Sequence, residues 1–261
     1  KIVVCIKQVP DTTEVKLDPK TNTLIRDGVP SIINPDDKAG IEVALRLKEQ
    51  VGGTVTLVCM GPPQADVALR EALAMGCDDA VLISGREFGG SDTLATSTII
   101  AAGIKTLDYD VIITGRQAID GDTAQVGPQI AEHLGIPQVS YAEELTADGD
   151  SLIVKRQFED RYQKIRVKTP CLITALSEIA EPRYMTVGGT IDAYAKEIKV
   201  LGFEELKDKL NPEHIGLKGS PTNVVKSFTK QAKGAGEVLK DASADDAVKA
   251  IIAKMEEKHI I

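Results

Sequence analysis

Short runs of β-branched and other apolar residues alternate with longer helical segments through the first half of the chain, and this alternation constrains the fold most. The first run, residues 1–6, reads KIVVCI and is apolar almost throughout, as in a strand buried on both faces of a parallel sheet. Further strands are expected at residues 54–60, 80–83, 110–114 and 138–141. Such alternation predicts a doubly wound parallel α/β sheet with right-handed crossovers and helices on both faces.

Helices are expected between these strands, at residues 35–50, 64–75, 92–104 and 123–134. The first begins with a strong signal, because Asn34 can act as its N-cap and proline suits the first helical position. Acidic residues follow in its first turn, where they meet the positive end of the helix dipole.

After residue 141 the rhythm changes. Runs at 152–157, 162–167 and 172–175 have strand character with short gaps, and we expect antiparallel additions to the same sheet. Two shorter runs, 15–17 and 23–26, flank a turn-rich segment and are expected to pair as a small hairpin.

The C-terminal part is less regular. Residues 211–222 are rich in proline, glycine and polar side chains, and residues 244–258 predict a final amphipathic helix. We therefore expect a nucleotide- or flavin-binding α/β domain over residues 1–210 and a C-terminal arm over 211–261. An arm of this kind grips either a partner or its own domain, and we favour the partner.

Composition limits the function classes. The chain has 261 residues, 43% hydrophobic residues and a net charge of −8, which together indicate a globular protein. A mildly acidic chain does not favour nucleic acid as a partner, because phosphate binding needs a basic face. The sequence opens on a strand-like run and has no apolar stretch of membrane-spanning length, so we expect a cytoplasmic protein without membrane insertion.

Cysteine and histidine patterns give no sign of a metal site. The four cysteines, which include no C-x-x-C pair, are Cys5, Cys59, Cys77 and Cys171. We expect them to be buried free thiols in a reducing compartment. The three histidines lie far apart and share no ligand spacing, so no metal is expected.

The familiar phosphate-binding and catalytic motifs are absent from the sequence. The loop after the first strand reads KQVPDTTE and has neither a G-x-G-x-x-G nor a P-loop lysine pattern. No Ser-His-Asp order or paired-acid arrangement stands out. We therefore expect no catalytic side chain, and favour a protein that holds a cofactor and lets the cofactor react.

Four loops follow strands of the predicted sheet, at residues 7–11, 61–64, 85–93 and 115–127. In an open parallel sheet, ligands bind beyond the carboxyl ends of the strands, at the crevice where strand order reverses. The convergence of these loops at one edge predicts the ligand site.

The loop at 115–127 reads GRQAIDGDTAQVG and has three glycines that allow close backbone approach to a ligand. A helix beginning near its end would direct the amides of residues 122–125 at a phosphate. Asp120 and Asp122 would then cap the helix or accept hydrogen bonds from ribose hydroxyls. The same composition also suits an ordinary capped helix after a glycine loop.

The loop before the third helix contains FGGSDTLATS, residues 88–97. Ser91 or Asp92 can cap that helix, and Thr93 and Thr96 then place their hydroxyls on one face of its first turn. This pattern suits a pyrophosphate, and it equally suits a plain threonine-containing helix start.

Three segments resemble a known family. Residues 115–135 resemble the nucleotide-binding segment of the electron transfer flavoprotein beta subunit, and residues 181–187 (EPRYMTV) resemble its recognition loop. Residues 154–174 resemble the beta-subunit signature, with these positions in register: Arg156, Glu159, Asp160, Gln163, Ile165, Pro170, Leu172, Ile173 and Thr174. Arg161 departs from it, because the signature usually has glycine or an acid there. KQVPDT, GPPQ and ALREALAMG also resemble the family, so the likeness covers nearly the whole chain.

The resemblance implies an adenine-nucleotide-binding α/β fold without the glycine fingerprint. It also implies a heterodimer with a larger alpha subunit that carries an FAD. The C-terminal arm would wrap this alpha subunit, and the chain would be active in redox chemistry only as part of the heterodimer. The recognition loop implies docking to an acyl-CoA dehydrogenase through Arg183, Tyr184, Met185 and Val187, with Val187 matching the apolar anchor.

Two branches of the family differ in what the beta subunit binds. In one it holds AMP as a structural filler. In the other it holds a second FAD, takes a hydride from NADH and sends the two electrons along separate paths, one to ferredoxin or flavodoxin and one through the alpha-subunit FAD to the dehydrogenase. GGSDTLATS resembles the FAD-holding branch, in which Thr93 and Thr96 would meet the pyrophosphate or ribityl chain. We favour this electron-bifurcating branch, with the AMP-binding carrier as the alternative.

In this reading the adenosine lies near Asp36 and the turn after Cys59, and the pyrophosphate lies against the helix near Thr123. The expected cofactor-binding residues are Lys7, Gln8, Val9, Asp36, Cys59, Met60, Gly61, Ser91, Asp92, Thr93, Thr96, Gly115, Arg116, Gln117, Ala118, Asp120, Gly121, Asp122, Thr123, Ala124, Gln125, Val126, Gly127 and Pro128.

Two other classes compete with this interpretation. A nucleotide-binding stress or signalling module of similar fold would not need the 154–174 signature or the long C-terminal arm. A stand-alone NADH–flavin oxidoreductase would not need the EPRYMTV loop.

Overall fold

The computed structural model describes residues 1–11, 30–222, 224, 225, 234, 236 and 238–261. The chain forms two compact units, Lys1–Val224 and Val225–Ile261. The hairpin predicted at residues 15–17 and 23–26 lies outside the described residues.

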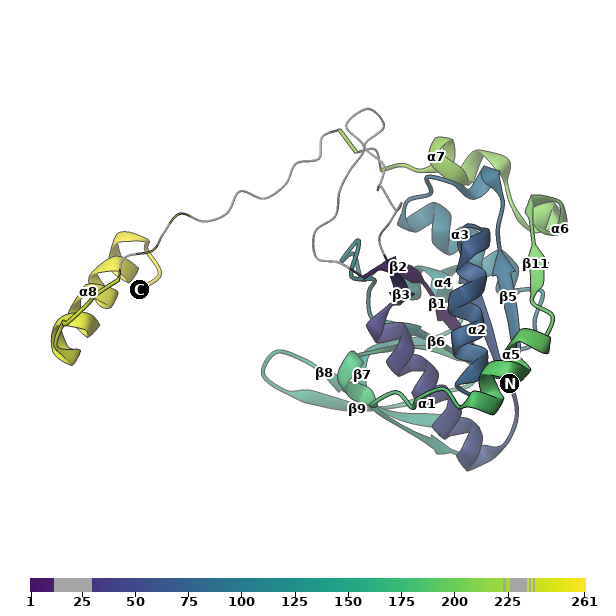
Figure 1. Ribbon diagram of the computed structural model, residues 1–261, viewed down its shortest axis with the longest axis horizontal. Coiled ribbons are helices and arrows are strands. Elements are labelled where there is room, and N and C mark those ends of the chain that lie inside the picture. The colour runs from purple at the N-terminus through teal and green to yellow at the C-terminus, as the bar shows by residue number, and fades with distance from the viewer. Residues whose placement is uncertain (12–29, 223, 226–233, 235, 237) are drawn as a thin grey trace. The chain divides into compact units, whose positions relative to one another are not determined.

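The first unit is built on a nine-stranded sheet with the order β11-β5-β4-β1-β6-β10-β7-β8-β9 (Figure 1). Its strands are β1 Ile2–Ile6, β4 Val55–Met60, β5 Asp79–Ile83, β6 Val111–Gly115, β7 Gln138–Asp148, β8 Ser151–Gln157, β9 Tyr162–Lys168, β10 Cys171–Ala175 and β11 Lys199–Leu201. All neighbours pair in parallel except β7 with β8 and β8 with β9. A separate antiparallel pair is formed by β2 Gln8–Pro10 and β3 Ser31–Ile33.

Helices cover both faces of this sheet (Figure 1). The longer ones are α1 Pro35–Val51, α2 Asp66–Ala74, α3 Thr93–Ile104, α4 Val126–Leu134 and α5 Val187–Ala195. The shorter turns are η1 Pro63–Ala65, η2 Arg86–Phe88, η3 Ser177–Ile179, α6 Phe203–Leu206, η4 Lys207–Lys209, η5 Pro212–His214 and α7 Gly216–Gly219.

The two faces of β1 belong to two separate cores, because successive side chains of a strand point to opposite sides. Val4 packs in one cluster with Ile41 of α1 and Leu69 of α2. Val3 packs in the other cluster with Ile99 of α3 and Ile130 of α4. Helices α1 and α2 therefore cover one face, and α3 and α4 cover the other.

Strand order reverses at β1, which has β4 on one side and β6 on the other. From β1 the chain adds β4 and then β5 on one side, and it then crosses back to add β6 on the other side of β1. A crevice opens at the carboxyl ends of such a strand pair, and this switch point is the usual ligand site of an open α/β sheet.

The predicted fold class, a mostly parallel doubly wound α/β sheet with antiparallel additions, is confirmed. One strand was assigned wrongly: residues 172–175 were expected to be antiparallel, but β10 lies between β6 and β7 and pairs in parallel with both. The reason is visible in its sequence, CLITA, which is buried at every position. A continuous apolar run suits a central parallel strand.

Several boundaries also differ from the predictions. Strand β7 extends to Asp148, well past residue 141, because its second half pairs with β8. Helix α5 and edge strand β11 were not predicted at all, since the sequence between residues 187 and 201 shows no clear period. The expected burial of the four cysteines is confirmed, and all of them are free thiols.

The second unit contains helix α8 Ala244–Glu257, whose first turn is capped by Ser243. Its apolar side chains Val248, Ile251 and Ile252 are exposed. The predicted helix at 244–258 is therefore confirmed to within one residue. Among the described residues, no helix is both long and apolar enough to cross a membrane.

Candidate functional site

A cavity of about 480 Å³ opens at the switch point, beyond the carboxyl ends of β1 and β6. This volume lies within the range of roughly 300–1,000 Å³ that is typical of small-molecule sites. The residues lining it are Cys5, Ile6, Lys7, Asp37, Met60, Phe88, Gly90, Ser91, Asp92, Thr93, Thr96, Ile100, Thr114, Gly115, Arg116, Gln117, Ala118, Gly121, Asp122, Thr123, Ala124, Gln125, Val126, Gly127 and Ile130.

Asp37 ties the two central strand ends together at this cavity. Its carboxylate accepts hydrogen bonds from the backbone amides of Lys7 at 2.8 Å and Gly115 at 2.9 Å. Burial raises the pKa of Asp37 to about 7, against the opposing effect of these amide hydrogen bonds. Position 115 requires glycine, because an added Cβ would lie 2.3 Å from Asp37 Oδ1.

The loop after β6 is held from two sides. Asn34 donates from its side-chain amide to the carbonyl of Gln117 at 2.8 Å and accepts from the amide of Ile119 at 3.0 Å. Lys7 Nζ lies 2.7 Å from Asp120 Oδ1. Asn34 was expected to cap α1, but its side chain makes no cap hydrogen bond and holds this loop instead.

Helix α4 begins later than predicted, at Val126 rather than at residue 123. Asp122 and Ala124 have positive φ angles of 49° and 52°, which a helix cannot contain. Ala124, with its positive φ, is followed by Gln125 in the right-handed helical region, and we call this turn the nest because backbone of alternating hand is typical of anion-binding nests. The first amides of α4 add to it, since they have no acceptor within the helix.

This turn packs closely on the sheet end. A Cβ at Gly127 would lie 2.6 Å from Thr114 Oγ1, so glycine is needed for the helix to approach β6. Neither expected aspartate caps α4: Asp120 pairs with Lys7, and Asp122 accepts from Gln117 Nε2 at 3.0 Å. The start of α4 therefore has no side-chain cap on its first backbone amides.

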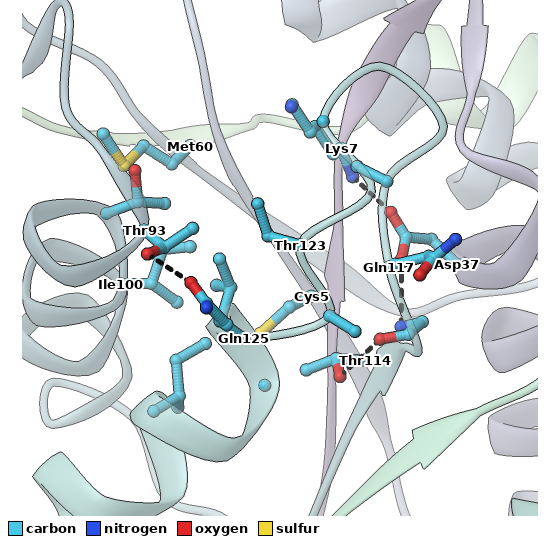
Figure 2. Close-up of a pocket in the computed structure, with 18 of the residues that line it drawn as sticks. Cys5, Lys7, Asp37, Met60, Thr93, Ile100, Thr114, Gln117, Thr123 and Gln125 are labelled. Carbon is cyan, nitrogen blue, oxygen red and sulfur yellow. Dashed lines mark hydrogen bonds between the residues drawn. The ribbon is translucent and has the colours of Figure 1, made fainter. Parts of the chain in front are cut away.

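Helix α3 supplies the opposite wall. Asp92 is its N-cap, with Oδ1 accepting from the amide of Ala95 at 3.0 Å. Thr93 Oγ1 donates to Gln125 Oε1 at 3.0 Å, which joins the starts of α3 and α4. Figure 2 shows Thr93, Met60 and Ile100 on one side of the cavity and Lys7, Asp37 and Gln117 on the other.

The cavity gathers most of the residues that were expected to bind the cofactor. Those that line it are Lys7, Met60, Ser91, Asp92, Thr93, Thr96, Gly115, Arg116, Gln117, Ala118, Gly121, Asp122, Thr123, Ala124, Gln125, Val126 and Gly127. Those that do not line it are Gln8, Val9, Asp36, Cys59, Gly61, Asp120 and Pro128. What any of them binds stays a prediction.

Some residues that were expected to bind the cofactor lie outside the cavity because they are buried in the core or because their side chains point elsewhere. Val9 and Cys59 are enclosed in the core, with at most 1% of their surface exposed. Asp36 faces Arg116, with 3.5 Å between the carboxylate and the guanidinium, while its helical neighbour Asp37 turns toward the cavity. Consecutive helical residues point about 100° apart, which a sequence motif does not resolve.

Sequence reasoning missed eight apolar, polar and glycine residues of the lining. They are Cys5, Ile6, Asp37, Phe88, Gly90, Ile100, Thr114 and Ile130. A signal existed for Cys5, Ile6 and Thr114, which stand at the carboxyl ends of predicted strands.

The segment at residues 183–187 lies at a second place on the surface, before and at the start of α5. Tyr184 is 94% exposed and Val187 is 82% exposed, so both are free to contact another molecule. Arg183 is occupied within the chain: it donates to Glu42 Oε2 at 2.8 Å and to Glu49 Oε1 at 2.7 Å.

The fold and the cavity define a parallel α/β protein with an anion nest and a ligand cavity at its switch point. Comparison with known proteins makes this specific, because the family model "Electron transfer flavoprotein domain" matches residues 21–205. The chain belongs to the electron transfer flavoprotein family.

Three relatives match over their whole length. The chain is 58% identical to "Electron transfer flavoprotein subunit beta" of Clostridium acetobutylicum, covering 100% of this chain and 99% of that protein. It is 52% identical to "Caffeyl-CoA reductase-Etf complex subunit CarD" of Acetobacterium woodii. It is 53% identical to "Acryloyl-CoA reductase electron transfer subunit gamma" of Anaerotignum propionicum. The last two comparisons cover 100% of both chains.

Proposed function

We propose that this chain is the beta subunit of a heterodimeric, electron-bifurcating flavoprotein that binds FAD in the cavity. It accepts a hydride from NADH, passes one electron to ferredoxin or flavodoxin, and passes the other through the alpha-subunit FAD to an acyl-CoA dehydrogenase. The relatives named as subunits of CoA-ester reductase complexes support the choice of partner.

The observation that carries the proposal is the extent of the cavity. It runs from the strand ends and the nest of α4 across to Thr93 and Thr96 of α3, and includes the apolar side chains Met60 and Ile100. AMP has one phosphate and no second ring system. A ligand that uses the nest, the α3 hydroxyls and the apolar wall together needs a pyrophosphate, a polyol and a flat apolar ring, as FAD has.

The donor set fits a dinucleotide. Amides at residues 123–127 would bind phosphate oxygens, because a nest and a helix N-terminus both favour an anion. Bonding between Lys7 and Asp120 would hold the loop in place around the ligand. When bound, FAD would supply the hydride and electron chemistry, and the residues of this chain would bind it, orient it and keep water away.

One observation favours the alternative, a conventional carrier whose beta subunit binds AMP. The Thr93 hydroxyl already has a partner in Gln125, so it is satisfied without a flavin. Binding of FAD by Thr93 would require this hydrogen bond to be exchanged for one to the ligand.

The proposal is tested by the dependence of one acceptor on the other. The heterodimer, its dehydrogenase and ferredoxin are mixed with NADH, with and without the enoyl-CoA that the dehydrogenase reduces to acyl-CoA. Bifurcation requires that ferredoxin reduction by NADH occurs only when the enoyl-CoA is also reduced. No ferredoxin reduction under either condition would leave the AMP-type carrier as the better account.

A further inference from the structure

The wall of the cavity formed by α3 is held from behind by residues 216–222, which we call the brace. This segment lies more than a hundred residues further along the chain, yet it is bonded to the turn that precedes α3. Leu217 donates from its amide to the carbonyl of Gly89 at 3.0 Å. The amide of Gly216 donates to Ser91 Oγ at 3.1 Å.

Ser220 makes the central contact. Its Oγ accepts from the amide of Asp92, the capping residue of α3, at 2.8 Å and donates to the carbonyl of Gly216 at 2.7 Å. Only 6% of Ser220 is exposed. Its hydroxyl therefore links the fold of the brace to the first residue of the cavity wall.

Asp92 is gripped on its side chain as well. Its Oδ2 accepts from the amide of Thr222 at 3.0 Å, while Oδ1 caps α3 through Ala95. Burial acts to raise the pKa of Asp92, but the hydrogen bonds from Ala95 and Thr222 hold it below its ordinary value. The carboxylate is therefore kept charged as the shared acceptor of α3 and the brace.

The backbone of the two segments is in close contact. Gly216 has a positive φ angle of 64°, and a Cβ there would lie 2.3 Å from the carbonyl of Glu87. Gly90 has a φ angle of 75°, and a Cβ there would lie 3.0 Å from Leu217 Cβ. Both sides of the contact thus depend on glycine, and the hydrogen bonds from Gly216 and Leu217 tie the turn before α3 to the brace.

We propose that Ser220 is a positioning residue that sets the selectivity of the cavity for FAD over AMP. It fixes the α3 wall, and with it Thr93 and Thr96, at the place where the flavin-side part of a dinucleotide would lie. The loop after β6 on the opposite wall is held by Asn34, Asp37 and Lys7, which make no hydrogen bond to the brace within the described part of the chain. The two walls meet through the hydrogen bond from Thr93 to Gln125. This inference rests on the proposed binding of FAD.

The test compares two ligands on the same protein. The full chain, co-purified with its alpha subunit and stripped of the nucleotide in this cavity, is titrated by calorimetry with FAD and, separately, with AMP. Loss of one neutral hydrogen bond that orders the wall should lower FAD affinity about three- to tenfold in Ser220→Ala. AMP affinity should stay within about twofold, because AMP uses only the opposite wall.

Two further variants keep the result interpretable. Ser220→Cys retains size but accepts hydrogen bonds weakly, so its FAD affinity should fall between those of the unmodified protein and Ser220→Ala. Ser151→Ala removes the same hydroxyl from β8, outside the cavity lining, where Ser151 is as buried as Ser220 and its Oγ donates to Asp150 Oδ1 at 3.0 Å. It should leave both affinities unchanged.

The possible outcomes separate cleanly. FAD affinity that falls from the unmodified protein through Ser220→Cys to Ser220→Ala, with AMP affinity unchanged, supports the positioning role of Ser220. Equal loss for FAD and AMP, or no loss for either, overturns it and leaves the proposed function standing. An unmodified protein that binds AMP and not FAD overturns the proposed function itself, and the selectivity argument with it.

Discussion

Burial and hydrogen bonding act in opposite directions on the pKa of the Asp37 side chain. The residue is buried beside the cavity, accepts two backbone amides and is placed next to Asp36 in sequence. Burial raises its pKa to about 7, so the folded chain holds this proton at pH values where an unfolded chain has released it. Proton binding by the folded state then favours folding at low pH.

This predicts a pH dependence of stability. Between about pH 4, the ordinary pKa, and about pH 7, the folded state binds more protons at Asp37 than the unfolded state does. The free energy of unfolding should therefore fall as pH rises, by at most roughly 1.4 kcal/mol per pH unit. Denaturant melts of the unmodified protein and Asp37→Asn from pH 5 to 8 measure this, and the unfolding free energy of the unmodified protein minus that of Asp37→Asn should fall with rising pH. Two parallel curves would show that Asp37 does not titrate in this range.

Thr93 and Thr96 are the residues that distinguish the two candidate ligands. Replacing both with valine keeps their shape and removes two hydroxyls, each worth about 1.5–3 kcal/mol if it bonds to a charged group. We expect the double variant to lose one flavin per heterodimer and NADH-driven bifurcation, and to keep the alpha-subunit FAD. Thr98→Val is the matched control, because Thr98 lies on the same helix and bonds to Leu94 and His133 outside the cavity lining. Full flavin content in the double variant would contradict a binding role.

At the scale of elements, α1 connects the cavity with the surface segment at 183–187. Its start holds the loop after β6 through Asn34 and Asp37. Its middle holds Arg183 through Glu42, which is only 3% exposed. Burial acts to raise the pKa of Glu42, but hydrogen bonds from Arg183 and Arg46 keep it below its ordinary value. The charged pair therefore fixes the segment that carries Tyr184 and Val187.

Val187 is the first residue of α5 and tests the docking role of that segment. An acidic residue is favourable in the first turn of a helix, so Val187→Asp should leave α5 folded while it removes an apolar anchor. We expect the free energy of binding to the dehydrogenase to weaken by about 2 kcal/mol or more. Electron transfer to the dehydrogenase should slow accordingly, while the flavin content stays intact. Val51→Asp, at another exposed valine, should have no such effect. Loss of flavin from Val187→Asp would mean that the residue supports the fold.

The sequence predicted the elements whose pattern is local and missed those that depend on distant partners. Strands β1, β4, β5 and β6 and helices α1 to α3 were placed within a few residues, because their apolar runs and caps are self-contained. The direction of β10 was predicted wrongly because it directly follows the β8–β9 hairpin in the chain, although its continuous apolar run is typical of a central parallel strand. The same limit applies to the cavity: the loops were expected to converge, but the brace on α3 comes from residues 216–222 and carries no motif.

At the scale of the whole molecule, the chain divides after Val224. We predicted the arm to begin at residue 211, whereas residues 212–222 contribute η5, α7 and the brace to the first unit. The second unit has an amphipathic helix with exposed Ile251 and Ile252, and we still propose that it grips the alpha subunit.

Removal of the arm tests this division. Deletion of Val225–Ile261 keeps the brace and the sheet, so the first unit should remain folded, with a cooperative thermal transition and with helical circular dichroism reduced only by the loss of α8. It should no longer co-purify with the alpha subunit at the yield of the full chain. Normal co-purification of the shortened chain would show that the arm is not needed for assembly.

We propose that the cavity at the switch point holds a second flavin. Acid release of the nucleotides from the purified heterodimer, followed by chromatographic quantification, decides between FAD and AMP. We expect two FAD and no AMP per heterodimer, one FAD from each subunit. One FAD and one AMP per heterodimer would instead identify the chain as the nucleotide-binding subunit of a conventional electron carrier.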